Sequence, residues 1–148
     1  MEIRKGLPED YAPAMELIAD FAEESLSEYG TYLDPAQLQK TFNAVYETSF
    51  VAVKDEKVIG ILAGRIIEDL CSKRPVYEEL VWYMHKKYRR YGIRLFYYIQ
   101  SWCYLNNISR ITMSCMHNSK TEKIFELYKK MGFRPMETRF IKELDNGG

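Results

Sequence analysis

Two kinds of hydrophobic spacing follow one another along the chain. Short β-prone runs indicate strands, and longer stretches in which apolar residues recur every three or four positions indicate amphipathic helices. We expect strands over residues 2–5, 49–54, 58–67, 77–84 and 110–116, and one bent or two short strands over residues 133–144. We expect helices over residues 8–24, 35–45, 92–105 and 119–131.

These elements follow one another in the order β-α-α-β-β-β-α-β-α-β, the last element being one or two strands. The order predicts an α/β (α+β) fold with a mixed, mostly antiparallel sheet of six to seven strands and about four helices. Asp55-Glu56 predicts a hairpin between adjacent strands. No linker or repeat interrupts the pattern, so we expect residues 1–148 to form a single domain. The short final strand suggests an edge that the second subunit of a homodimer would cover.

A basic segment joins the expected strand over residues 77–84 to the helix that Gly92 opens. The first N–H groups of a helix lack intrahelical partners and lie at the positive end of its dipole, so they bind anions. Five basic side chains add to that charge: Lys86, Lys87, Arg89, Arg90 and Arg94. The sequence therefore predicts a phosphate-binding site at the carboxyl end of a strand, where open α/β sheets bind ligands.

Charge is unevenly distributed, although the net charge is zero. From Leu80 to Thr121 the chain has seven Lys and Arg and no Asp or Glu, which indicates a polyanionic partner for this part. Single-stranded nucleic acid is one alternative, because basic and aromatic side chains interleave here. The side chains concerned are Tyr88, Arg89, Arg90, Tyr91, Arg94, Tyr97 and Tyr98. The balanced charge and a pI of about 6.7 argue against nucleic acid.

The three cysteines, Cys71, Cys103 and Cys115, are widely spaced and include no C-x-x-C pair. Free thiols are typical of a reducing compartment, and we expect Cys103 and Cys115 to be small core residues, the latter inside a strand. No apolar run reaches the length of a membrane span and the N-terminal residues are charged. We therefore expect a cytoplasmic protein with no membrane partner, and no residue cluster predicts a metal site.

Two segments carry a likeness to a known family. Tyr83 to Arg94 form a strand followed by a match to R/Q-x-x-G-x-G/A, with Arg89 at the arginine and Gly92 at the first glycine. Leu127 to Phe133 match L-Y-x-K-x-G-F at the end of the last helix. In both motifs and in its order of elements the chain resembles the GNAT superfamily of N-acetyltransferases, in a compact form like those of bacterial and phage-encoded members.

The resemblance implies acetyl-CoA as the cofactor, lying between the strands expected at residues 77–84 and 110–116. Its pantetheine would pair with the backbone at Trp82, Tyr83 and Met84. Its pyrophosphate would lie on a segment made of Arg89, Arg90, Tyr91, Gly92, Ile93 and Arg94. Arg94 stands where the family has a second small residue, so it would either crowd the pyrophosphate or ion-pair with it. Asn118 resembles an asparagine that contacts the cofactor in relatives.

The resemblance also implies a direct acetyl transfer to a primary amine. Tyr128 falls on the family's tyrosine, which protonates the departing CoA thiolate, and Glu78 matches a strand position where some members carry a general base. Glu79 is its neighbour on the opposite face of the strand.

The acceptor is expected to be an amine on a small molecule or a protein. In relatives it is bound beside a loop that corresponds here to Glu24, Ser25, Tyr29 and Tyr32. A chain with this fold that has lost catalysis and serves as a CoA-binding or structural module is a further alternative.

Overall fold

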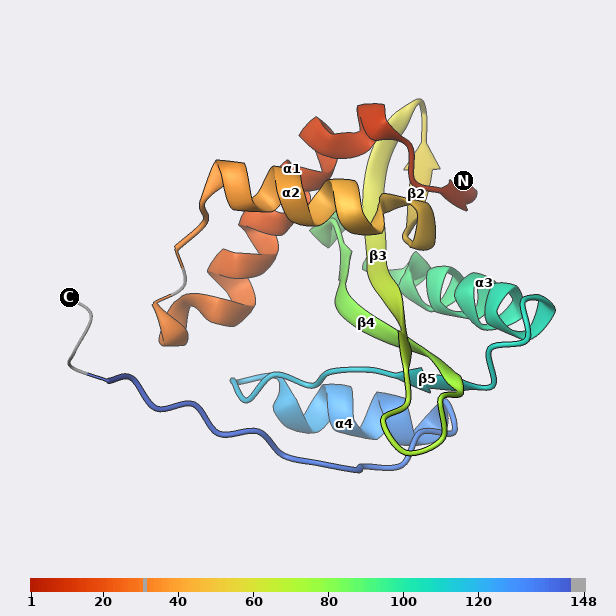
Figure 1. The fold of residues 1–148 in the computed structure, drawn as a ribbon. Coiled ribbons are helices and arrows are strands. Elements are labelled where there is room, and N and C mark those ends of the chain that lie inside the picture. The colour runs from red at the N-terminus through yellow and green to blue at the C-terminus, as the bar shows by residue number, and fades with distance from the viewer. Residues whose placement is uncertain (31, 145–148) are drawn as a thin grey trace. The chain divides into compact units, whose positions relative to one another are not determined.

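The structure, a computed structural model, describes residues 1–30 and 32–144. The chain divides into two compact units, Met1–Ser114 and Cys115–Gly148 (Figure 1). The strands of the first unit are β1 (Glu2–Lys5), β2 (Phe50–Lys54), β3 (Lys57–Glu68), β4 (Pro75–Met84) and β5 (Arg110–Thr112). Its α-helices are α1 (Tyr11–Phe21), α2 (Pro35–Val45) and α3 (Gly92–Leu105). Short helical turns are η1 (Pro8–Asp10), η2 (Ala22–Leu26), η3 (Ser27–Tyr29), η4 (Tyr46–Thr48) and η5 (Lys86–Tyr91).

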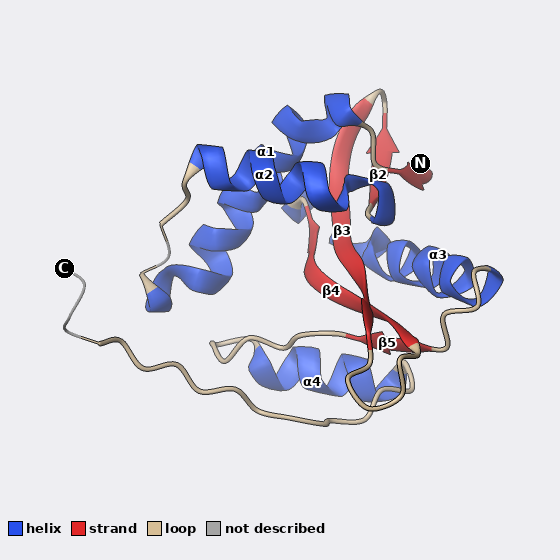
Figure 2. Cartoon of the chain, viewed as in Figure 1, coloured by secondary structure: helices blue, strands red, loops and turns tan. Residues whose placement is uncertain are grey.

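The strands form one sheet in the order β1-β2-β3-β4-β5 (Figure 2). The first four strands pair antiparallel with their sequence neighbours, and β5 pairs parallel with β4. The expectation of a mixed, mostly antiparallel sheet is therefore confirmed. The expectation of six to seven strands was wrong, because the described residues form five. The four expected helices are present, the fourth being α4 (Thr121–Lys130) in the second unit.

One face of the sheet packs against α1 and α2. Val51, Ile61 and Val81 contribute to this face, and Leu17 of α1 and Phe42 of α2 cover it. All five side chains are buried, and each contributes about 1.5–3 kcal/mol of hydrophobic stabilisation. The apolar stripes that predicted α1 and α2 are thus the sides of the helices that meet the sheet.

The opposite face packs against α3, because successive residues of a strand point to opposite sides. Phe50 of β2 lies 5.3 Å from Trp102, measured between ring centroids. Trp82 of β4 lies 6.1 Å from Phe96 in the same way. The start of α3 is consequently fixed against the end of β4.

Local sequence signals explain two of the connections. Asp34 caps α2, since its side chain accepts a hydrogen bond from the backbone N–H of Gln37 at 3.1 Å. Asp55 and Glu56 both adopt positive φ, 50° and 65°, as a two-residue hairpin turn between β2 and β3 requires. The hairpin at Asp55-Glu56 and the start of α2 at residue 35 agree with the predictions from sequence.

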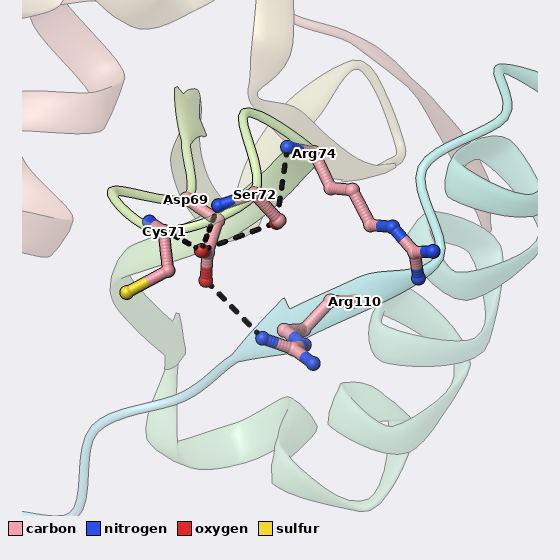
Figure 3. Close-up of polar contacts among 5 residues, drawn as sticks. All are labelled: Asp69, Cys71, Ser72, Arg74 and Arg110. Carbon is pink, nitrogen blue, oxygen red and sulfur yellow. Dashed lines mark hydrogen bonds and ion pairs between the residues drawn. The ribbon is translucent and has the colours of Figure 1, made fainter.

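A second turn, between β3 and β4, is built around Asp69 (Figure 3). Its Oδ1 accepts hydrogen bonds from the backbone N–H groups of Cys71 at 2.9 Å and Ser72 at 3.0 Å. These two backbone donors hold the pKa of Asp69 below its usual value. The other oxygen pairs with Arg110 at 3.3 Å. Asp69 therefore ties the turn to the first residue of β5.

The pairing of β4 with β5 ends early. Its last pair is Glu78 with Thr112, although β4 continues to Met84. The register of β3 against β4 shifts beside Leu80, and such a bulge bends a strand and increases its twist. Beyond β5, the backbone N–H of Ser114 donates to the Glu79 side chain at 3.4 Å. The expected strand over residues 110–116 is therefore wrong beyond Thr112.

The second unit is organised by α4. Gly132 follows the helix with φ 93°, the left-handed conformation in which glycine is favoured. The N–H of Gly132 donates to the carbonyl of Lys129 at 3.1 Å, and that of Phe133 donates to the carbonyl of Tyr128 at 3.0 Å. These two bonds form a Schellman motif, which ends the helix at the glycine of the L-Y-x-K-x-G-F segment.

Two predictions for this unit were wrong. Residues 133–144 form no strand, whereas one or two were expected. Four large apolar residues of this segment, Met136, Phe140, Ile141 and Leu144, are exposed rather than packed on a sheet. Cys115 lies beyond β5 rather than inside it. Among the described residues, no helix is both long and apolar enough to cross a membrane.

Candidate active site

The segment between β4 and α3 is a tight helical turn rather than an open loop. The His85 N–H donates to the Ile59 carbonyl at 2.8 Å, which keeps the segment on the sheet. The His85 carbonyl then accepts from the Tyr88 N–H at 2.8 Å, and its Nδ1 accepts from the Lys87 N–H at 3.3 Å. The basic residues of η5 therefore have a fixed backbone.

Gly92 allows α3 to start close to β4. A Cβ atom at this position would lie 3.2 Å from Cγ of Met84 and 3.8 Å from Nε1 of Trp82. The N-cap residue Tyr91 makes no side-chain capping hydrogen bond, and the first turn of α3 holds no acidic residue. The Gly92 N–H donates to the Arg89 carbonyl of η5. The positive end of the α3 dipole is thus free of a neutralising carboxylate in its own first turn, which favours an anion there.

Two guanidinium groups gather on Tyr91. Arg90 lies 4.5 Å and Arg94 lies 5.3 Å from the centroid of the Tyr91 ring. Arg90 also donates a hydrogen bond to the Tyr91 hydroxyl at 3.0 Å, which lowers the pKa of Tyr91. The Arg94 guanidinium thus lies against the Tyr91 ring. Gly92, two residues earlier, packs close to Met84. Ile93, the remaining residue expected to hold the cofactor, is half-buried in the first turn.

Arg89 and Lys86 are basic residues of this turn that pair with one carboxylate, that of Glu24, and Arg89 lies closer to it. Arg89 donates to Oε2 of Glu24, which lies on η2, a π-helical turn after α1. The other oxygen of Glu24 accepts a hydrogen bond from the Tyr83 hydroxyl at 2.9 Å and lies 3.7 Å from Nζ of Lys86. Burial and this hydrogen bond raise the pKa of Tyr83 to about 12. Burial opposes the charge on Arg89, but Glu24 and Tyr83 outweigh it and raise the Arg89 pKa.

The end of β4 offers backbone rather than side chains. Tyr83 and Met84 bury their side chains, and Trp82 packs against Phe96. Since β5 pairs with β4 only up to Glu78, no strand of the described residues pairs with the β5-facing edge of β4 from residue 79 onward. Its N–H and C=O groups can pair with amides of an extended ligand. This edge leads directly to the cationic helix start.

Two neighbouring carboxyl groups lie where β4 and β5 separate. Glu78 forms an ion pair at 2.8 Å with Arg65, its cross-strand neighbour on β3. Glu79 is 6% exposed, and burial raises its pKa to about 8, despite the hydrogen bond from the Ser114 N–H. Burial therefore favours the protonated form of Glu79, a feature that sequence reasoning missed because this burial depends on the tertiary fold.

The residues expected to bind the acceptor are only partly brought together. Glu24 and Ser25 lie on η2 and Tyr29 lies on η3, while Tyr32 is 81% exposed. An open cleft of about 490 Å³ adjoins Glu24, and its lining consists of Asp20, Glu23, Glu24, His85 and Lys86. The spacing of Asp20, Glu23 and Glu24, three and four residues apart, could have revealed this acidic helix face.

In the second unit, Asn118 and Tyr128 are positioned by local contacts. The Asn118 side chain accepts a hydrogen bond from the backbone N–H of Lys120 at 2.8 Å. The backbone N–H of Asn118 donates to Oγ1 of Thr121 at 2.7 Å. The rings of Tyr128 and Phe133 pack at 5.4 Å, which is the apolar contact that accompanies a Schellman cap. The L-Y-x-K-x-G-F motif thus forms the C-terminal cap of α4.

The first unit is a mixed sheet whose fourth strand leads through a cationic turn into α3. The family model described as Acetyltransferase (GNAT) family matches residues 13–133. The chain therefore belongs to the GNAT family of acetyltransferases, and the resemblance noted in the sequence is confirmed. No curated protein sequence matches the chain.

Solved structures of acetyltransferases share the fold. A ribosomal-protein-alanine N-acetyltransferase from Brucella melitensis biovar Abortus 2308 matches with a TM-score of 0.76 and 13% identity, covering 97% of this chain and 98% of that one. An aminoglycoside acetyltransferase from an uncultured soil metagenomic sample gives 0.72 and 17%, with coverage of 97% and 98%. A Trypanosoma brucei acetyltransferase gives 0.72 and 16%, with coverage of 97% and 99%. At these identities the likeness concerns the fold.

The buried Glu79 makes stability depend on pH. In the folded chain it keeps its proton up to a pH of about 8, whereas its ordinary pKa is 4.5. The folded state therefore binds more protons between these values, so a rising pH should destabilise it. Relative to Glu79→Gln, which does not titrate there, the wild type should lose at most about 1.4 kcal/mol of unfolding free energy per pH unit.

Urea denaturation from pH 5 to pH 8.5 measures this difference. Glu16→Gln removes an exposed carboxylate of α1 and is the matched control, whose difference from the wild type should stay constant. A constant difference for Glu79→Gln as well would contradict the buried, protonated state of Glu79.

Proposed function

We propose that this chain is an acetyl-CoA-dependent N-acetyltransferase that transfers an acetyl group to a primary amine by direct attack. The observation that carries the proposal is the strand edge of β4 after its pairing with β5 ends at Glu78, leading to the helix start at Gly92. Such an edge suits the amide groups of pantetheine, and such a helix start suits a diphosphate. Membership of the GNAT family of acetyltransferases also supports the proposal.

The backbone at Trp82, Tyr83 and Met84 would hold the pantetheine arm. The N–H groups at the start of α3, with Arg89 and Arg90, would hold the diphosphate. Acetyl-CoA supplies the acetyl thioester. Backbone N–H groups near Met84 would stabilise negative charge on the carbonyl oxygen, an effect worth about 3 kcal/mol in other enzymes.

The acceptor amine must lose a proton before it attacks, because an alkylammonium has a pKa near ~10. Glu78 would take this proton directly or through water, once the acceptor competes with Arg65 for its carboxylate. Glu79 is a second candidate, since a group with a pKa of about 8 lies near the operating pH of a general base. Both lie where β4 leaves β5.

Tyr128 would donate a proton to the departing thiolate. Its ring is held against Phe133 by the cap of α4, so the hydroxyl has a fixed direction. Asn118, at the start of α4, would contact the cofactor. Both roles rest on the motifs of the family.

The acidic cleft beside Glu24 favours a cationic acceptor. Ser25, Tyr29 and Tyr32 would add hydroxyl groups around it. Two structural relatives are named for an aminoglycoside and for a ribosomal-protein alanine, so amines of different sizes are acetylated on this fold. We propose a small-molecule or protein amine and no nucleic acid.

Binding of acetyl-CoA tests the cofactor assignment. At a hundredfold excess over its dissociation constant it should stabilise the fold by about 2.7 kcal/mol, seen as a rise of several degrees in Tm. Arg90→Ala should weaken binding roughly tenfold by calorimetry, because it removes one charge-assisted contact. The exposed Arg134, in the second unit, provides the control Arg134→Ala. Absence of any Tm shift at millimolar acetyl-CoA would contradict the proposal.

Tyr128→Phe tests the general acid. The phenylalanine keeps the ring contact with Phe133 and removes only the hydroxyl, so kcat should fall about a hundredfold while the Kd for CoA changes less than about twofold. Tyr104→Phe, at an exposed position of α3, should leave both quantities unchanged. An equal loss of turnover and of CoA affinity would mean that Tyr128 serves packing.

A further inference from the structure

Glu24 and Arg89 are 65 residues apart in the sequence and form an ion pair in the first unit. The Glu24 side chain is only 17% exposed, whereas the Arg89 side chain is 42% exposed. The carboxylate is also held by the Tyr83 hydroxyl, at 2.9 Å from its other oxygen. Glu24 is therefore the better anchored member of the pair, and Arg89 reaches toward it from η5.

Arg89 now binds the carboxylate of Glu24, and in the proposed function it binds a diphosphate, which offers similar anionic oxygens. A guanidinium presents its donors in a planar fork, which fits carboxylate and phosphate oxygens equally well. A diphosphate at the start of α3 must therefore compete with Glu24 for Arg89. The effect is reciprocal: the ion pair with Glu24 weakens diphosphate binding, and a bound diphosphate weakens the ion pair to the same extent.

Glu24 also belongs to the cleft in which the acceptor is expected. Its neighbours in the lining are Asp20, Glu23, His85 and Lys86, so three of the five side chains are carboxylates. Lys86 lies 3.7 Å from Glu24 and is 73% exposed, which makes it a weak, solvent-screened partner. When Arg89 leaves, Glu24 retains the Tyr83 hydrogen bond and the exposed Lys86, and it loses its nearest cationic partner. An ammonium group is the complement of the carboxylate charge.

We propose that Glu24 is a positioning residue that couples the two substrates: it restrains Arg89 until a diphosphate takes the guanidinium, and it then binds the ammonium group of the acceptor. This inference rests on the proposed function. It predicts an order of events in which the acyl-CoA binds first and strengthens the site for the amine. It also predicts that Glu24 opposes CoA binding, contrary to the role of an ordinary contact residue.

Calorimetric titration with CoA of the wild type, Glu24→Gln and Glu28→Gln tests the coupling. Glu24→Gln is isosteric and removes the competing charge, so it should bind CoA three- to tenfold more tightly. Glu28→Gln removes an exposed charge from η3 nearby and should stay within about twofold of the wild type. In an Arg89→Ala background, Glu24→Gln should no longer increase CoA affinity, because the guanidinium for which Glu24 and the diphosphate compete is absent.

A kinetic measurement separates this role from simple packing. In Glu24→Gln the KM for a diamine acceptor should rise about tenfold while kcat changes little, since the ammonium loses its counter-charge. Equal CoA affinities for Glu24→Gln and Glu28→Gln, or a gain that persists without Arg89, would overturn the coupling. Failure of the wild type and all variants to bind CoA would instead overturn the proposed function itself.

Discussion

The early separation of β4 from β5 is the constraint on which the candidate site depends. The bulge beside Leu80 bends β4, and Asp69 holds the start of β5 through Arg110. The two strands therefore share three residue pairs and then part. Among the described residues, no strand pairs with the β5-facing edge of β4 after Glu78, and such an edge is where an extended ligand can add to a sheet. The cationic turn and the start of α3 lie at the end of this edge.

Much of the first unit could be predicted from sequence, because its signals are local. The apolar stripes of α1, α2 and α3, the Asp34 cap and the hairpin at Asp55 each depend on a few adjacent residues. The ends of strands could not be predicted in the same way. Residues 113–116 have strand-like composition, but the bulge and the bond between Glu79 and Ser114 are tertiary features.

The candidate site divides along the same line. Arg89 and Gly92 could be identified by their spacing after a strand, and Tyr128 by the cap of α4. The contact of Arg89 with Glu24 joins residues 65 positions apart, so no local sequence pattern could predict it. Likewise, the burial that keeps Glu79 protonated follows from the packing of the sheet. Electrostatic relations between distant residues are thus what the structure adds.

Hydrogen–deuterium exchange with and without acetyl-CoA tests the central claim most directly, namely that the β4 edge and the start of α3 form one binding site. Peptides covering residues 79–94 should become protected when acetyl-CoA is added, because their amides gain acceptors. Peptides covering α2 (35–45) should exchange at the same rate in both samples. Unchanged exchange over residues 79–94, at a concentration of acetyl-CoA that raises Tm, would contradict the account.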